Sequence, residues 1–250
     1  MQNKIKTPAE IKAMRESGRI LAAVLDVLKH TIQPGMTTMD LEMKAREELH
    51  HLGGEPAFLG YQGYPGVLCV SVNDEVVHGM PGPRIIEEGD IVGMDFGVVI
   101  NGMMTDGAIS VIVGKPTSTK DEELVKVTER ALMASIAQVK NGARVGDLAA
   151  AAQDVLDKAG FGIVRDLVGH GVGHELHEEP NIPNYGSRGS GPVLKTGMTI
   201  AIEPMATLGD YKVFISPDLW TVKTRDGSKS AHFEHTVLVT EKGSEILTIL

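Results

Sequence analysis

The chain has 250 residues, of which 42% are hydrophobic and 23% are charged, and its formal net charge is −9 at pH 7. A chain of this length and composition buries about 70% of its unfolded surface, which excludes intrinsic disorder as its main state. No apolar run approaches the ~20 residues of a membrane helix, and no export signal is recognisable at the start. We therefore expect a single domain over residues 1–250, located in the cytoplasm and without membrane contact.

The cysteine count and the charge narrow the classes of ligand. One cysteine forms no internal disulfide and no cysteine cluster for zinc or iron–sulfur, so that any metal would bind through carboxylates and histidines. An excess of acidic over basic residues, 33 against 24, opposes non-specific binding to nucleic acid. Nucleic acid is therefore not an expected partner.

The first half of the chain predicts two helices followed by strands. Thr7 and Glu10 form a capping box with proline between them, and apolar residues at helical spacing extend this helix to a break at residues 33–35. A second helix begins near Thr38 and stops at Gly53. Segments rich in valine and isoleucine and bounded by glycine, proline and asparagine are typical of strands, here 67–72, 91–100 and 108–113.

The same order recurs in the second half. A helix with a polar start at residues 118–123 runs to Val139, and an alanine-rich helix follows the Asn141-Gly142 break and ends at Gly160. Several landmarks return at a nearly constant interval: Gly35 and Gly142, Asp40 and Asp147, Gly53 and Gly160, and Asp95 and Glu203. The sequence therefore predicts two copies of a helix–helix–strands unit, about 1–115 and 116–250. Blocks of helices and strands with a hairpin in each half favour an α+β fold with a mainly antiparallel sheet.

Two aspartates mark the first candidate site. Asp95 interrupts the most apolar strand, where an isolated carboxylate is costly to bury. A hairpin turn at Asn101-Gly102 would set Asp95 and Asp106 opposite or diagonal on one face of the sheet. Hydrogen bonding at a strand end explains either residue alone, but the pair favours a shared cation.

The repeat adds two more carboxylates. Glu203 is the counterpart of Asp95 and again ends an apolar strand, and Glu234 precedes a β-rich run much as Asp106 does. Duplication would bring these four acids toward one axis. Such a cluster is destabilising unless metal ions offset its charge, or unless some of the acids stay protonated as coupled pairs.

A glycine-rich segment at residues 169–173 supplies a histidine. Its glycines disfavour a helix, so this is not the zinc-protease H-E-x-x-H pattern, and His170 lies in a loop that could approach a metal closely. Four acids with one histidine suit manganese, iron, cobalt or zinc and disfavour calcium and copper. Five ligands leave room for water on two ions, which can share a hydroxide and polarise a carbonyl, so hydrolysis of an amide or ester is expected.

The motifs resemble those of type I methionine aminopeptidases, in the short bacterial form, over essentially the whole chain. The resemblance rests on segments in the family's order and spacing: 60–65, 71–81, the Asp95 and Asp106 pair, 169–173, 177–180, 202–205 and 234–236. It implies the pita-bread fold, a pseudo-two-fold structure around a curved sheet. It also implies removal of the initiator methionine from nascent polypeptides, usually when the second residue is small.

The resemblance assigns roles residue by residue. Asp95 would bind one metal ion, His170 and Glu203 the other, and Asp106 and Glu234 both, giving two divalent ions per chain (cobalt, manganese, iron or zinc). His177 would hydrogen-bond the scissile carbonyl and His78 the peptide nitrogen, with Glu203 as the candidate proton shuttle. The family's methionine pocket falls on apolar and aromatic positions: Phe58, Tyr61, Tyr64, Cys69, Leu176 and Trp220.

Two positions depart from the family pattern. Gly107 stands where a serine or threonine usually follows the second aspartate, which puts the metal affinity in question because a supporting hydroxyl is missing. Leu176 replaces the aromatic residue of some relatives and would loosen the rim of the pocket.

Two other interpretations remain open. A proline-specific relative, an Xaa-Pro dipeptidase or aminopeptidase, would keep the five ligands, but such enzymes carry a large extra N-terminal domain, and here the first helix starts at Thr7. A pita-bread protein that has lost catalysis would act as a binding partner of peptides, histones or RNA, against which the intact ligands and the negative charge argue. We expect a monomer, with nascent polypeptide N-termini as substrates and transient contact with the ribosome as a further candidate interaction.

Overall fold

The computed structural model describes residues 4–250. Four α-helices lie in two pairs along the chain, α1 (Pro8–Thr31) with α2 (Thr38–Leu52), and α3 (Thr119–Ile136) with α4 (Val145–Ala159). A short 3₁₀ turn covers Tyr61–Gly63. The strands are β1 (Glu55–Pro56), β2 (Leu68–Val72), β3 (Glu75–Val77), β4 (Ile91–Ile100), β5 (Met103–Ile112), β6 (Gly162–Ile163), β7 (Gly169–Gly171), β8 (Glu178–Ile182), β9 (Thr199–Ile202), β10 (Met205–Thr207), β11 (Val213–Ile215), β12 (Val222–Thr224), β13 (Ser230–His232), β14 (Glu234–Val239) and β15 (Ser244–Ile246).

Local sequence sets the ends of the helices as expected. Thr7 and Thr37 cap α1 and α2 with complete capping boxes, and Ser118 caps α3. Gly53 and Gly160 end α2 and α4 in the left-handed conformation that glycine adopts without strain. Matching glycines therefore end the second helix of each half.

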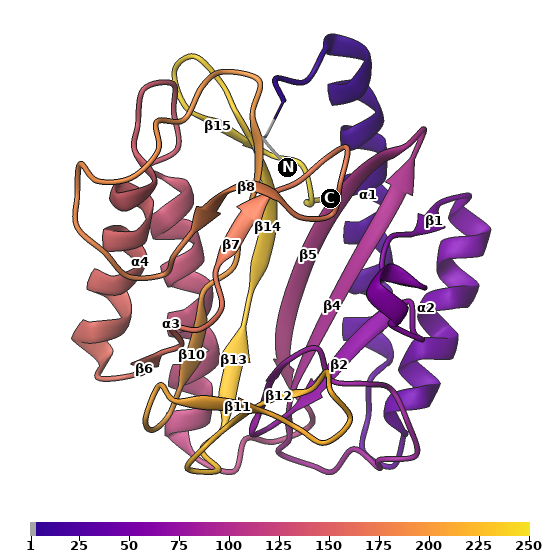
Figure 1. Ribbon diagram of the computed structural model, residues 1–250. Helices are drawn as coiled ribbons and strands as arrows, with labels where there is room; N and C mark the ends of the chain where they lie inside the picture. Colours follow the sequence, from indigo (N-terminus) through magenta and orange to yellow (C-terminus); the bar gives the residue numbers. More distant parts are fainter. Residues whose placement is uncertain (1–3) are drawn as a thin grey trace.

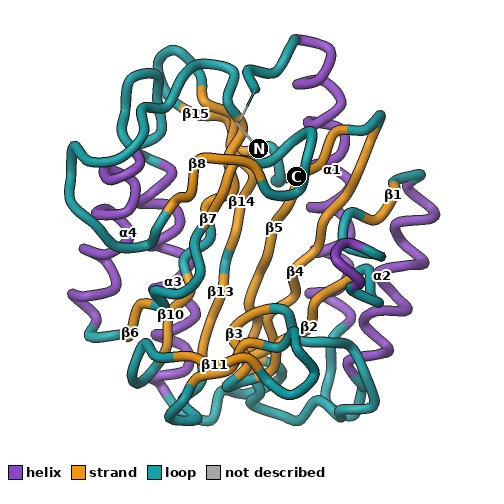
Figure 2. Tube along the Cα trace, in the orientation of Figure 1, coloured by secondary structure: helices purple, strands orange, loops and turns teal. Residues whose placement is uncertain are grey.

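One large antiparallel sheet runs through the molecule in the order β1-β4-β5-β14-β9-β7-β8, with β2 paired to β4 and β15 paired to β14. The strands cross the centre of the molecule between the helix pair α1–α2 on one side and α3–α4 on the other (Figures 1 and 2). Two small sheets, β13-β10-β6 and β11-β12-β3, complete the β structure of residues 4–250. An α+β fold with a mainly antiparallel sheet is confirmed.

The helix pairs bury apolar faces against opposite halves of this sheet. Residues of α1 and α2 form one core with β2 and β4 around Phe96 and Met94, both fully buried. Residues of α3 and α4 form two others with strands of the second half, around Ile200 and Ala206. Burial of each such side chain stabilises the fold by about 1.5–3 kcal/mol, so the helices hold the sheet rigid from outside.

Several predicted bounds differ from the structure. The strand expected at 108–113 begins at Met103, so that Asp106 lies inside a strand rather than before one. The helix expected to reach Val139 ends at Ile136. The second half contains hairpins, among them β14 with β15, but β9 and β14 do not form one: they pair although β10 to β13 lie between them in the chain. His170 lies in strand β7 and not in a loop.

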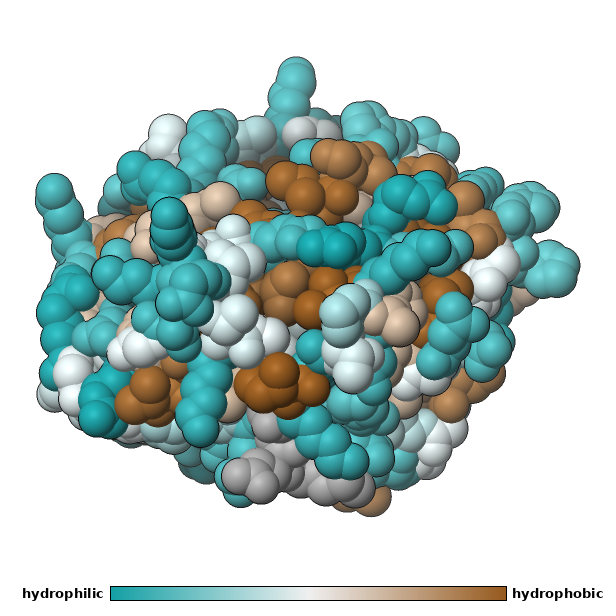
Figure 3. Space-filling view, turned by 90° about the horizontal axis from the view of Figure 1, so that it is seen from above, coloured by the Kyte–Doolittle hydropathy of each residue, from teal (hydrophilic) through white to brown (hydrophobic). Residues whose placement is uncertain are grey.

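One face of the molecule is mostly hydrophilic (Figure 3). Seen from above, hydrophilic side chains surround separate smaller hydrophobic patches (Figure 3). Over residues 4–250, none of the helices combines the length and the apolar character needed to cross a bilayer.

Candidate metal centre and active site

Strand register places four carboxylates on one face of the large sheet. Ala108 of β5 pairs with Asp95 of β4 on one side and with Glu234 of β14 on the other. Directly paired residues point to the same face, and so do residues two apart on one strand, which adds Asp106. The two aspartates are therefore diagonal neighbours, one of the two arrangements that the hairpin predicts.

The second half supplies the remaining two side chains by the same rule. His170 of β7 pairs with Ala201 of β9, and Glu203 follows Ala201 by two residues. Ala201 in turn pairs with Thr236 of β14, two residues after Glu234. The same face of the sheet therefore carries His170, Glu203 and Glu234.

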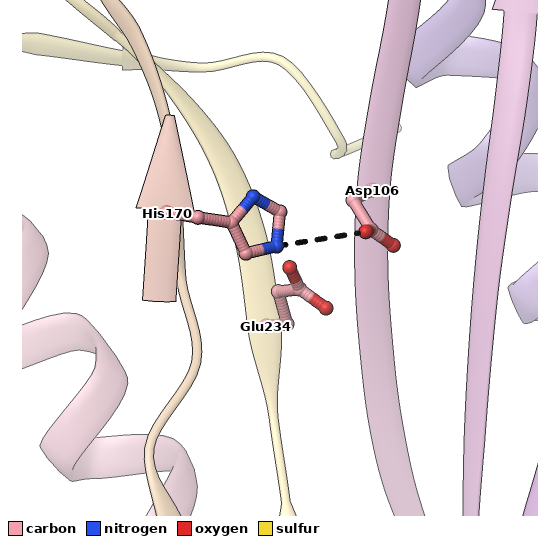
Figure 4. A group of neighbouring side chains, drawn as sticks. All are labelled: Asp106, His170 and Glu234. Carbon is pink, nitrogen blue, oxygen red and sulfur yellow. Dashed lines mark ion pairs between the residues drawn. The ribbon is translucent and has the colours of Figure 1, made fainter. Parts of the chain in front are cut away.

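Three of these side chains already have the geometry of a metal site. Ligand atoms of Asp106, His170 and Glu234 all lie within 4.8 Å of one another and all three residues are buried. They project toward each other from β5, β7 and β14 (Figure 4). His170 Nε2 lies 3.9 Å from Asp106 Oδ2 and 3.4 Å from Glu203 Oε1.

The ring of His170 is oriented for binding through Nε2. Its Nδ1 lies 2.9 Å from the carbonyl oxygen of Gly171, which only accepts hydrogen bonds. Nδ1 therefore carries the proton and the lone pair of Nε2 faces the carboxylates. Burial lowers the pKa of His170 to about 3, so the ring is neutral near pH 7, the form that binds metals.

A pocket of about 200 Å³ opens over this face. Its lining joins the five candidate ligands to His78, His177 and the predicted methionine pocket, and adds Gln62; the full set is Phe58, Tyr61, Gln62, Tyr64, Cys69, His78, Asp95, Asp106, His170, Leu176, His177, Glu203, Trp220 and Glu234. Among residues 4–250, no lysine or arginine belongs to this lining, so the described cations do not compensate the four acids.

The pKa values of the four acids reflect their burial close to one another. Burial raises the pKa of Asp95 to about 7, and burial together with the neighbouring acids raises the pKa values of Asp106 and Glu234 well above their ordinary range. The pKa of Glu203 is raised well above its usual value by burial and by Asp95. Without metal, the acids of this face therefore share protons.

Buried polar atoms without a hydrogen-bond partner, here called orphaned, show whether metal ions suit this site. Among the described residues, only four buried side-chain atoms have no hydrogen-bond partner, and three of them lie here: Asp95 Oδ1, Glu234 Oε1 and His232 Nε2. Buried acceptors without donors are costly, and divalent cations satisfy them while offsetting the repulsion between the acids. The oxygen-rich donor set with one imidazole fits first-row divalent ions.

These raised pKa values predict a stability that depends on pH and metal. In the unfolded chain the same carboxyls lose their protons near pH 4, whereas in the folded metal-free protein they keep them to higher pH. Raising the pH above 7 therefore favours the unfolded state. The buried histidines change the stability in the opposite direction, but only below their ordinary pKa, so they do not contribute above pH 7.

The measurement is thermal unfolding of chelator-treated protein at several pH values above 7. The melting temperature is expected to fall with rising pH in the metal-free protein and to fall much less with saturating Mn²⁺, which binds the deprotonated acids. Parallel pH profiles with and without metal would contradict the prediction.

His78 and His177 both line the pocket. His78 adopts a φ of 59°, a left-handed conformation that costs a non-glycine residue energy and is typical of functional positions. It is held by Gly79, whose carbonyl accepts from Val70 N and whose added Cβ would lie 2.2 Å from Val70 O. Burial lowers the pKa of His78 to about 4 and also lowers that of His177, so both are neutral near pH 7.

His177 contacts residues from both halves of the chain. Its Nδ1 lies 2.8 Å from the hydroxyl of Tyr61, and its ring centroid lies 4.3 Å from that of His170. A Tyr61 hydroxyl that donates to Nδ1 leaves the proton of the neutral ring on Nε2. His177 then presents an N–H donor beside the candidate metal ligands.

The predicted methionine pocket forms one apolar cluster beside these groups. Ala57, Phe58, Tyr64, Cys69 and Leu176 are buried together, and Tyr61 and Trp220 pack against them. The rings of Tyr64 and Trp220 meet edge to face at 5.1 Å. Leu176 is 3% exposed, so the leucine fills the wall of the pocket at this position.

The structure changes the interpretation of Gly107, whose missing hydroxyl was expected to reduce the support of Asp106. A Cβ at this position would lie 3.1 Å from Leu21 Cδ2, 3.4 Å from the backbone oxygen of Glu234 and 3.7 Å from Thr248 Cβ. The two side chains among these neighbours, of Leu21 and Thr248, are not part of the pocket. A hydroxyl at residue 107 would therefore face helix α1 and the C-terminal segment. Support for Asp106 comes instead from the Gly107 N–H, 3.0 Å from Asp106 Oδ1.

Two contributors escaped the sequence analysis. His232 is 3% exposed, and its Nε2 lies 3.7 Å from Glu203 Oε2. Thr236 accepts a hydrogen bond from Asp106 N and donates to Asp106 O, which fixes β5 against β14. The spacing of two between His232, Glu234 and Thr236 is the signal that could have indicated a shared face.

The fold and this site define a metallopeptidase. The model of metallopeptidase family M24 matches residues 12–241, and the chain belongs to that family, whose peptidases use divalent metal. Among its relatives, methionine aminopeptidase 1 of Bacillus subtilis is 46% identical over 243 residues, covering 97% of this chain and 98% of the relative.

Solved structures give the same picture. The methionine aminopeptidase of Thermotoga maritima superposes with a TM-score of 0.98 at 48% identity, covering all of both chains. The prolidase of Pyrococcus furiosus superposes with a TM-score of 0.77 at 27% identity, covering 98% of this chain but only 65% of the prolidase. The expected pita-bread fold is confirmed by these similarities.

Proposed function

We propose that this protein is a methionyl aminopeptidase that removes the N-terminal methionine of new polypeptides, preferring a small second residue. The observation that carries the proposal is that one pocket contains both a buried cluster of acids and histidine and a wall of apolar and aromatic side chains. The relatives named methionine aminopeptidase, matched over nearly their full length, support the same activity.

We further propose two divalent ions per chain, manganese, iron, cobalt or zinc. Asp95 would bind one ion, His170 and Glu203 the other, and Asp106 and Glu234 both. Ions held in this way polarise a carbonyl and lower the pKa of water. The short distances among the ligand atoms of Asp106, His170 and Glu234 and the orphaned oxygens of Asp95 and Glu234 support this assignment.

Binding of the substrate follows from the wall of the pocket. The methionine side chain would enter between Phe58, Tyr64 and Trp220, where a flexible, polarisable thioether packs well against aromatic rings. The pocket, of about 200 Å³, joins this wall to the candidate metal ligands, so a methionine bound here would place its amide beside them. A methionine side chain seated against this wall would displace water from it and so strengthen the polar contacts at its edge.

The chain's own groups would guide the protons of the reaction. The Nε2–H of His177 donates to the scissile carbonyl oxygen and stabilises the negative charge that develops there. His78 hydrogen-bonds the peptide nitrogen. Glu203 would take a proton from the attacking water and return it to the leaving amine.

The decisive test of function is release of free methionine. Protein reconstituted with one metal at a time should release methionine from Met-Ala-Ser and should release it more slowly as the second residue becomes larger. Hydrolysis of Ala-Pro peptides in preference would support the proline-specific alternative. Binding of peptides by metal-loaded protein without any release of methionine would support a binding module.

Location and partners follow from the substrate. Nascent N-termini would be met in the cytoplasm, with transient contact to the ribosome, by a protein acting as a monomer. Gel filtration of metal-loaded protein and co-sedimentation with ribosomes would test these points.

A further inference from the structure

A buried ion pair lies next to the active site but outside its pocket. Lys6 Nζ is 2.8 Å from Glu178 Oε2, and the two side chains are 0% and 2% exposed. Lys6 directly precedes the cap of α1, whereas Glu178 begins β8 and directly follows His177. Burying such a pair gains little stability over apolar packing, so its position suggests a different use.

The carboxylate of Glu178 closes the turn formed by residues 173–178. Its Oε1 accepts hydrogen bonds from the backbone N–H of His174, at 2.8 Å, and of Glu175, at 3.3 Å. Its Oε2 accepts from Lys6. The backbone of Lys6 is itself fixed, because its N–H donates to Gly197 O at 2.9 Å.

Gly173 makes room for the lysine. Its φ is 148°, and an added Cβ would lie 2.4 Å from Lys6 Cε and 3.0 Å from Lys6 Nζ. The carbonyl of Gly173 accepts from Met104 N at 2.7 Å, so the start of the turn is also tied to β5. Gly173 is therefore explained by the packing of Lys6, 167 positions earlier in the chain, and not by the metal site.

A second contact joins the same two segments. His174 Nε2 lies 2.8 Å from Glu10 Oε1 in the first turn of α1. The start of α1 therefore holds the turn at two points, one buried and one partly exposed. The residues that this turn carries, Leu176 and His177, both line the active-site pocket.

We propose that Lys6 and Glu178 are positioning residues for His177. The buried pair fixes the turn of residues 173–178, and the turn sets the ring of His177 at the distance from His170 and Tyr61 that catalysis requires. The inference rests on the proposed function, in which His177 contacts the substrate. Neither Lys6 nor Glu178 touches the substrate.

The first test is Lys6→Met, which removes the ammonium and keeps a stem of similar length. Release of methionine from Met-Ala-Ser is expected to show a kcat lower by about 10- to 100-fold, since small displacements of catalytic groups have effects of this size. KM and the metal affinity measured by calorimetry should change by less than about twofold. Lys12→Met, at an exposed position in the nearby helix α1, is the matched control and should behave as the unaltered protein.

The second test does not depend on activity. Amide hydrogen exchange of His174 and Glu175 should become faster in Lys6→Met than in the unaltered metal-loaded protein, with little change in the core strands β5 and β14. Should Lys6→Met not fold because Glu178 is left unpaired, Lys6→Met with Glu178→Gln buries no lone charge and is expected to fold, with the same faster exchange and lower kcat.

A folded single or double variant with unchanged exchange, or with kcat within about twofold of the unaltered protein, would overturn the proposal. Failure of the proposed function is distinguishable, because the unaltered protein would then release no methionine at all, while the exchange measurement still tests the effect of the pair on the turn.

Discussion

Asp106→Asn is expected to abolish the tight binding of metal and to lower methionine release by about 10³-fold or more, since bound divalent ions supply several kcal/mol of transition-state stabilisation. Ligand atoms of Asp106, His170 and Glu234 lie within 4.8 Å of one another, so the loss of this charge affects both proposed ions. An asparagine keeps the shape of the side chain but is neutral. Metal content by mass spectrometry and methionine release from Met-Ala-Ser check the result.

The same variant should be more stable than the unaltered protein when both are metal-free above pH 7. One of the buried acids whose pKa is raised is then gone, and with it part of the repulsion. Asp157→Asn, at an exposed position of α4, is the matched control and should change neither metal content nor activity. Full metal stoichiometry with full turnover in Asp106→Asn would refute the proposed centre.

His177→Ala is expected to lower kcat by about 10²- to 10³-fold, the usual loss when one donor to a developing oxyanion is removed. KM and metal binding should change little, because His177 is a donor to the reacting carbonyl and not a proposed ligand. Tyr61→Phe should show a smaller loss in kcat, since it removes only the hydroxyl that lies 2.8 Å from Nδ1 of His177.

Steady-state kinetics with Met-Ala-Ser, combined with calorimetric titration of Mn²⁺, separates the alternatives for His177. A raised KM with an unchanged kcat would mean that His177 contributes only to ground-state binding. Loss of metal in proportion to the loss of activity would instead assign it to the metal shell through its contact with His170.

Local patterns predicted those parts of the fold that local chemistry determines. The capping box at Thr7, the start of α2 at Thr38, the glycines that end α2 and α4, and the apolar run of β4 lie where the sequence places them. Strand register then brings Asp95 and Asp106 together, because the Asn101-Gly102 turn fixes the hairpin.

Non-local features could not be read in this way. The pairing of β9 with β14 spans the four inserted strands β10 to β13, and only the tertiary structure shows that it persists. Lys6 and Glu178 are in contact although they lie far apart in the sequence, and no periodic pattern in the sequence links the two residues. His232 was missed for a related reason, since its burial beside Glu203 depends on the small sheet of β10 and β13.

The most direct measurement is the anomalous scattering of crystals grown with Mn²⁺. Two peaks about 3.5–4 Å apart, each within bonding distance of the side chains proposed for it among Asp95, Asp106, His170, Glu203 and Glu234, are the predicted result. Peaks outside this group of residues, or no bound manganese in protein that releases methionine, would contradict it.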